Sequence, residues 1–170
     1  MFKEKSYRTL KKLETIKEEN IDNFRLCFTG NLRDENGLSS YAGAIFILEN
    51  GIHREFQAFY DTLDNTIPTQ AEYYSLLHGL KLACSLNIRN LNIFSHHDII
   101  QHFFSDEEKN IKNSILASLY FEIREILEKF DVIKFNYISK EKNKRAVKLD
   151  NCAFKNKQQN QKHYSQIKHN

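Results

Sequence analysis

The chain is poor in the residues that interrupt regular structure or cross-link small folds. Its 170 residues include one proline, five glycines, three cysteines and no tryptophan. So little proline and glycine excludes a collagen-like or low-complexity chain. The cysteines, Cys27, Cys84 and Cys152, are odd in number and lack C-x-x-C spacing, which argues against a disulfide framework and against a zinc site. We expect three reduced, mostly buried thiols.

Long hydrophobic runs are also absent. No apolar stretch approaches the roughly 20 residues that cross a bilayer, and the first residues are charged rather than the apolar core of a signal peptide. We therefore expect a soluble, intracellular, cytoplasmic protein without membrane contact. Hydrophobic residues make up 41% of the chain, which suffices for a buried core, and the length suits one compact domain.

Known nucleotide-binding glycine patterns are missing, as is the G-x-S-x-G turn of serine hydrolases. The charge distribution is more informative. Residues 140–170 hold nine Lys or Arg against two acidic residues, a local net charge of +7. Because the whole chain carries +3, the other 139 residues carry −4. A basic end on an acidic body suits an anionic partner such as nucleic acid, and a merely solvated basic tail is the alternative.

The hydrophobic periodicity predicts alternating strands and helices. The expected strands cover 24–29, 41–48, 52–60, 91–95 and 132–138, and the expected helices cover 68–86, 98–104, 106–129 and 143–155. Before them, residues 1–22 contain an apolar stripe of Leu10, Leu13 and Ile16 that is typical of an amphipathic helix. After them, residues 156–170 lack apolar periodicity and are predicted to be a basic, polar, disordered tail. The main domain is therefore expected over residues 23–155.

The predicted helix that follows Pro68 carries a specific motif. Residues 71–83 read A-E-Y-Y-S-L-L-H-G-L-K-L-A, which matches the pattern A-E-Y-x-A-L-x-x-G-L-x-x-A except that Ser75 replaces alanine. Other matches are Phe28-Thr29-Gly30 at the end of the first strand and Asn143-x-x-Ala146-x-x-Leu149 in the last helix. Over residues 24–154 the chain resembles the ribonuclease H family, including the ribonuclease H domains associated with reverse transcriptases.

This resemblance implies an α/β, ribonuclease H-like fold. Its five-stranded mixed sheet would have the order 3-2-1-4-5, with helices on both faces and the extra N-terminal helix before it. Family members cut the RNA of RNA/DNA hybrids with two Mg²⁺ ions held by four carboxylates. Carried over to this sequence, the carboxylate positions are Gly30 (or Thr29), Glu72, His96 and Val147, so only Glu72 retains its acid.

Glycine, imidazole and valine cannot replace three carboxylates around hard Mg²⁺ ions. The sequence therefore favours a catalytically degenerate member that needs no cofactor. Asp98 and Asp150 lie near two of the lost positions and would have to rebuild the centre, with Mg²⁺, if the domain were active. Asp98 can instead cap the short helix, and Asp150 can instead lie on a solvated helix face.

Glu72 has a second interpretation, because Thr69-x-x-Glu72 has the spacing of a helix capping box. We also considered whether His96, His97 and Asp98 bind a metal ion. Adjacent residues on a strand point to opposite faces, so the two histidines are not expected to share one ion. A site built from His96, Glu72 and Asp150 is an alternative, and no metal site is predicted.

Three functions are compatible with these observations. In the first, a degenerate ribonuclease H-like domain binds nucleic acid, as an RNA/DNA hybrid or duplex, or a protein partner, without cleavage. Its basic residues would be Lys140, Lys142, Lys144 and Arg145, between the last strand and the last helix. In the second, an active ribonuclease H uses relocated carboxylates. In the third, the domain is a scaffold that docks a protein partner through its N-terminal helix.

Overall fold

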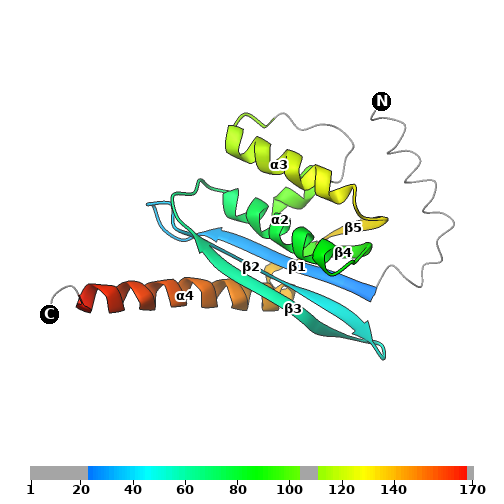
Figure 1. The fold of residues 1–170 in the computed structure, drawn as a ribbon, viewed down its shortest axis with the longest axis horizontal. Helices are drawn as coiled ribbons and strands as arrows, with labels where there is room; N and C mark the ends of the chain where they lie inside the picture. The colour runs from blue at the N-terminus through cyan, green and yellow to red at the C-terminus, as the bar shows by residue number, and fades with distance from the viewer. Residues whose placement is uncertain (1–22, 104–110, 168–170) are drawn as a thin grey trace.

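The fold is built on a five-stranded sheet (Figure 1). The computed structural model describes residues 23–103 and 111–167. The strands are β1 (Phe24–Leu32), β2 (Ser39–Glu49), β3 (Ile52–Leu63), β4 (Asn90–Ser95) and β5 (Val132–Tyr137). Their order is β3-β2-β1-β4-β5, with β1–β2 and β2–β3 antiparallel and β1–β4 and β4–β5 parallel. The predicted strand order 3-2-1-4-5 is confirmed.

Helices cover both faces of the sheet (Figure 1). Helix α2 (Gln70–Ser85) and helix α3 (Ser114–Leu127) lie on one face, and helix α4 (Lys144–Ile167) lies on the other. Two 3₁₀ helices, η2 (Asp98–Phe103) and η3 (Lys140–Lys142), follow β4 and precede α4. None of the described helices combines the length and the hydropathy needed to cross a membrane.

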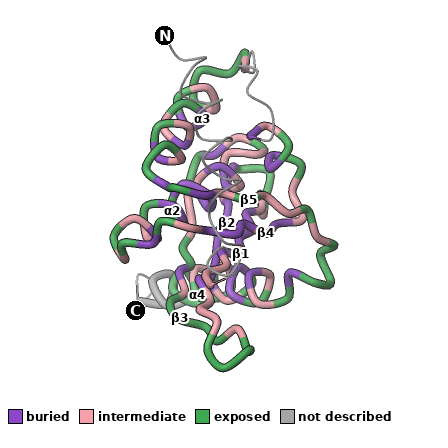
Figure 2. Tube along the Cα trace, turned by 90° about the vertical axis from the view of Figure 1, so that its right-hand side faces the viewer, coloured by how far each residue is buried: buried purple, intermediate pink, exposed green. Residues whose placement is uncertain are grey.

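Side-chain size sets how closely each helix approaches the sheet. On the α2 face, Leu26 and Phe28 are fully buried beside Leu76 and Leu80, so this side forms the main core, which runs through the middle of the molecule in Figure 2. On the α4 face the core is small, because Ala42 and Ala44 of β2 meet Leu149. The short alanine side chains let α4 lie close to the strands.

Ion pairs attach the start and the middle of α4 to β3 and to the loop after it. The Arg145 guanidinium forms a bidentate pair with Glu55, with 2.7 Å between Nη2 and Oε1. Further along, the Lys157 amine lies 3.0 Å from the Asp64 carboxylate. The predicted disordered tail is therefore wrong over 156–167, where α4 continues to Ile167. Lysine and glutamine favour helix, and the segment has no glycine or proline to stop it.

Two other expectations change, and a third lies outside the described residues. The helix predicted over 106–129 begins only at Ser114, while 104–110 lie outside the described residues. The N-terminal helix predicted within 1–22 also lies outside them. All three cysteines are free and half-buried rather than fully buried.

The start of α3 provides a test of this assignment. The Asn113 side chain accepts hydrogen bonds from the backbone N–H groups of Ile115 and Leu116, at 3.0 and 3.1 Å. Asn113→Ala should lower the free energy of unfolding by about 1 kcal/mol, whereas Asn113→Asp should keep it nearly unchanged. Urea denaturation measures both. Equal stability of the alanine variant and the parent would show that α3 does not begin there.

Candidate functional site

Polar side chains gather where the parallel strands β1 and β4 end. Glu72 lies in the first turn of α2, His96 and His97 follow β4 directly, and Asn143 precedes α4. Gly30 lies in β1 beside them. The carboxyl ends of parallel strands and the helices that follow are where α/β folds place their ligand sites. The resemblance assigned its four carboxylate positions to this same region.

Gly30 is pressed against the first turn of α2. A Cβ atom at this position would lie 2.7 Å from the Glu72 backbone nitrogen, and closer still to the Ala71 carbonyl group. Real side chains essentially never make such contacts, and backbone atoms cannot turn aside as a flexible side chain can. The position assigned to the first carboxylate therefore has no room for any side chain in this backbone arrangement.

His97 links Glu72 to β1. Its Nε2 atom lies 2.8 Å from the Thr29 hydroxyl and 3.4 Å from the Gly30 backbone nitrogen, and its Nδ1 atom lies 3.4 Å from Glu72 Oε1. Because the Gly30 N–H can only donate, Nε2 accepts and we assign the ring hydrogen to Nδ1, facing the carboxylate. The capping-box expectation is wrong: Thr69 makes no side-chain cap and has a left-handed backbone, φ 74°.

His96 is held as a neutral imidazole. The buried Asn143 amide donates to the Phe28 carbonyl at 2.9 Å and to His96 Nδ1 at 3.0 Å. Burial, with smaller effects of His97 and Lys140, lowers the pKa of His96 to about 4. The His96 and His97 rings lie 4.2 Å apart between centroids. They do not point to opposite faces as expected, because the chain leaves the strand at Ser95 and alternation ends there.

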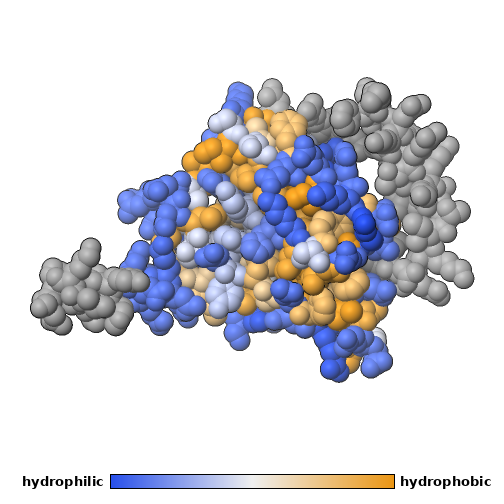
Figure 3. Space-filling model, in the orientation of Figure 1, coloured by the Kyte–Doolittle hydropathy of each residue, from blue (hydrophilic) through white to orange (hydrophobic). Residues whose placement is uncertain are grey.

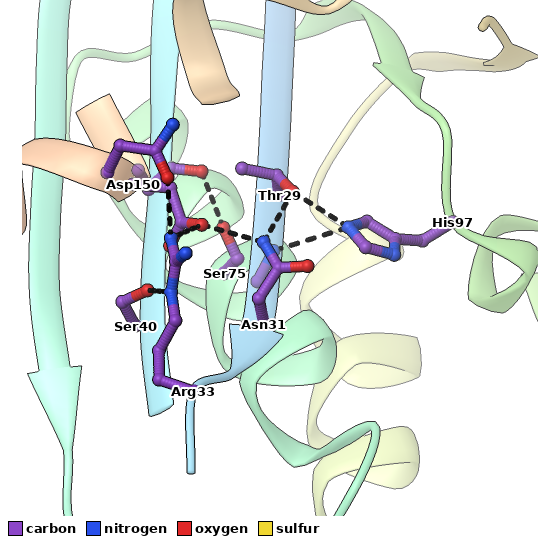
Figure 4. Close-up of polar contacts among 10 residues, drawn as sticks. Thr29, Asn31, Arg33, Ser40, Ser75, His97 and Asp150 are labelled. Atoms are coloured by element: carbon purple, nitrogen blue, oxygen red, sulfur yellow. Dashed lines mark hydrogen bonds and ion pairs between the residues drawn. The ribbon is translucent and has the colours of Figure 1, made fainter. Parts of the chain in front are cut away.

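Asp150 is a buried partner of β1 and the loop after it. It is 1% exposed, and its Oδ2 atom accepts from Asn31 at 2.6 Å and forms an ion pair with Arg33. The expected solvated helix face is therefore wrong. Arg33 also donates to Ser40, at 2.6 Å. Figure 4 shows that Thr29 and Asn31 of β1 join these contacts into one network, with His97 on one side and Arg33 with Asp150 on the other.

Asp98 belongs to a different part of the site. It lines a pocket of about 360 Å³ whose wall includes Thr69, Glu72, His96, His97, His102 and Tyr137. Asp150 does not line this pocket. Within residues 23–103 and 111–167, no three His, Cys, Asp or Glu side chains are placed to hold a metal ion. The alternative of His96, Glu72 and Asp150 is therefore not assembled, since Glu72 faces His97 and Asp150 faces Arg33.

The residues present do not fit a Mg²⁺ pair. Around Glu72 the pocket offers imidazoles, a hydroxyl and one further carboxylate, Asp98, whereas a Mg²⁺ pair takes oxygen ligands in strict octahedral geometry, usually several carboxylates and water. At the fourth assigned position stands Val147, which is uncharged and lines a groove on α4 instead. The buried carboxylate of Asp150, near this position, is paired with the guanidinium of Arg33.

The basic residues predicted to bind nucleic acid divide between two sides of α4. Arg145 is engaged by Glu55 next to the sheet. Lys140 and Lys144 line an outward groove of about 390 Å³, together with Lys148 and Lys155, and Lys142 is exposed in η3. Sequence reasoning missed Lys148 and Lys155. They follow Lys144 by 4 and 11 residues, which places all three lysines on one face of a helix. This spacing could have identified them from the sequence.

It also missed two residues of the polar centre, Asn31 and Arg33, and it considered His97 only as a metal ligand. Thr29, Asn31 and Arg33 alternate along the chain, and residues two apart share one face of a strand. The prediction ended this strand at Thr29, which concealed the pattern.

Comparisons with known proteins place this architecture among ribonuclease H-like folds. Ribonuclease H1 from the halophilic archaeon Halobacterium salinarum superposes with a TM-score of 0.69 at 20% identity, covering 78% of this chain and 98% of that one. The N-terminal ribonuclease H domain of a Mycobacterium tuberculosis protein gives a TM-score of 0.70 at 18% identity, covering 81% and 96%. A search of curated proteins found no significant match.

A third solved structure is the LC11 ribonuclease H1 in complex with an RNA/DNA hybrid, with a TM-score of 0.66 at 19% identity, covering 76% and 95%. These similarities define the fold class. The family itself follows from the sequence, since a model described as reverse transcriptase-like matches residues 28–153. The chain belongs to this reverse transcriptase-like, ribonuclease H-like family, as the motif at 71–83 indicated.

The contact at Gly30 yields a direct test. Gly30→Ala should lower the free energy of unfolding by about 2 kcal/mol or more, because overpacking a rigid site costs roughly 1–3 kcal/mol and here the obstacle is backbone. Chemical denaturation with urea provides the measurement. Gly51→Ala is a useful comparison, because a Cβ there meets nothing within 4 Å and only the positive φ of 77° opposes it. A Gly30→Ala variant as stable as the parent would refute the close contact.

The neutral His96 predicts a pH dependence of stability. Between about pH 6.5 and pH 4 the unfolded chain binds a proton that folded His96 does not, because its folded pKa is lowered to about 4. The free energy of unfolding should therefore fall as the pH falls through this window. His96→Gln should flatten the dependence. Urea midpoints at pH 7, 5.5 and 4.5 measure it, and identical slopes for His96→Gln and the parent would contradict it.

Proposed function

We propose that this ribonuclease H-like domain binds a nucleic-acid duplex, including an RNA/DNA hybrid, without cutting it. The observation that carries the proposal is Gly30, whose contact with the α2 backbone leaves no space for the first carboxylate. His96 and Val147 remove two more. A phosphodiester hydrolase of the two-metal type needs several carboxylates around two ions, whereas Glu72 is the single acid left at the four family positions and shares its pocket with one further acid, Asp98.

Binding does not depend on those carboxylates. Duplexes are held mostly through their phosphates and sugars, and RNA/DNA hybrids are recognised by their shape and backbone rather than by base edges. The basic residues between β5 and the middle of α4 supply charge for this. The solved complex of the LC11 ribonuclease H1 with an RNA/DNA hybrid shares the fold, which supports the hybrid as the first ligand to test.

An active enzyme with relocated carboxylates is the competing function. It requires Glu72, Asp98 and Asp150 to converge on one pair of ions. Asp150 is instead buried and paired with Arg33, and only Asp98 shares a pocket with Glu72. Freeing Asp150 would break a buried ion pair, which typically costs about 3–5 kcal/mol. This cost favours the non-cleaving function.

Both functions are separated by one experiment on the full chain. A labelled RNA/DNA hybrid is incubated with the protein in Mg²⁺ or Mn²⁺, with an active ribonuclease H1 as positive control, and binding is followed by fluorescence anisotropy. The expected result is saturable binding and intact RNA, unchanged in Glu72→Gln. RNA cleavage that disappears in Glu72→Gln would overturn the proposal. Failure to bind any duplex would leave the scaffold hypothesis.

A further inference from the structure

We propose that the outward face of α4 is the surface that holds the phosphate backbone of the duplex. The inference rests on the proposed function and names the contact surface, which differs from the pocket over Glu72. The surface is the open groove of about 390 Å³ lined by Lys140, Lys144, Val147, Lys148, Asn151, Cys152 and Lys155. We call it the α4 groove. Figure 3 shows hydrophilic side chains over the described part of α4.

The lysines of the α4 groove form a line. At about 100° per residue, Lys144, Lys148 and Lys155 lie within roughly 40° of one another, and on the side opposite the buried Ala146 and Ala153. The helical rise of about 1.5 Å per residue spreads the three over roughly 16 Å. Such a row of positive charges matches the repeated charges of a phosphate backbone.

These lysines are available to a ligand, unlike the other cations of α4. Arg145 and Lys157 are paired with Glu55 and Asp64 on the sheet side. Among the residues that the structure describes, no ion pair involves any of the four groove lysines. Arg145 and Lys157 therefore attach α4 to the sheet side, whereas the groove lysines face outward.

The floor of the α4 groove carries no negative charge. Val147 stands where the family resemblance assigns a carboxylate, and Val147 is part of the groove wall. The neighbouring Asp150 is 1% exposed and is neutralised by Arg33. An anion in the groove therefore meets lysines without an opposing carboxylate. The loss of the fourth acid fits the binding of phosphate as well as it fits the loss of metal chemistry.

The lining also indicates what kind of nucleic acid fits. Single strands are bound by aromatic side chains on which bases stack, and the groove has none. The nearest aromatic residue of α4, Phe154, has its ring covered by the Arg33 guanidinium at 5.1 Å. The residues that most often anchor protein partners are Trp, Tyr and Arg, and none of these lines the groove. A duplex, with its bases stacked inside and its phosphates outside, is the ligand that this lining suits.

The test uses anisotropy with a labelled 20-base-pair RNA/DNA hybrid and its single strands, in 50 to 200 mM KCl. The variant Lys144→Gln/Lys148→Gln/Lys155→Gln is compared with Lys112→Gln/Lys129→Gln/Lys134→Gln, which changes the net charge equally at exposed positions away from α4. Each phosphate contact steepens the fall of log K with log salt concentration by about 0.9. Three contacts therefore make the parent lose roughly 40-fold more affinity over this salt range than the groove variant. The control should keep the parent's slope.

A second pair of variants tests the floor of the groove. Val147→Asp should weaken hybrid binding several-fold at low salt, because its negative charge repels the phosphates. Val147→Asn should not, because asparagine resembles aspartate in size and polarity but is uncharged. If the parent binds the hybrid and the groove variant keeps its salt slope, the inference is overturned while the proposed function stands. If single strands bind as tightly as the hybrid, the duplex assignment is overturned. If the parent binds nothing, the proposed function itself fails.

Discussion

The close approach of β1 to the first turn of α2 sets the geometry of the polar centre. Gly30 brings its backbone against the backbone of Ala71 and Glu72. Further along α2, Gly79 leaves room for the side chain of Leu26, four residues before Gly30 in β1. At Gly30 the strand and the helix therefore meet backbone to backbone, whereas at Gly79 one leucine side chain lies between them. A side chain at position 30 would have to push α2 away along its first turn.

This contact has consequences for the charges around it. With no carboxylate from β1, Glu72 is matched by the imidazole of His97, and Asp150 by the guanidinium of Arg33. Asp150 thus has the positive partner that a buried acid requires, and Glu72 faces the N–H that His97 carries on Nδ1. The centre connects β1, β4, α2 and α4 through hydrogen bonds, and it does so with groups that are poor ligands for Mg²⁺.

The sequence predicted the fold far better than the site. Strand order followed from the motif at 71–83 together with the periodicity, because both report local patterns that the fold preserves. The absence of three carboxylates was also visible. That Asp150 is buried depends on β1 continuing past Gly30 to bring Asn31 and Arg33 against α4, which local periodicity cannot show. The helical end of α4 was missed because it depends on helix-forming residues and the Lys157–Asp64 pair rather than on an apolar stripe.

Central to this account is that Gly30 and the matched acids leave no divalent-metal centre at the ends of β1 and β4. Titration of the ¹⁵N-labelled protein with Mn²⁺ tests it directly, since a bound paramagnetic ion broadens the amide resonances near it. The account predicts that Gly30, Glu72 and His96 keep their line widths up to millimolar Mn²⁺, apart from uniform weak effects over the surface. Selective broadening of these three resonances, saturable and reversed by Mg²⁺, would contradict it.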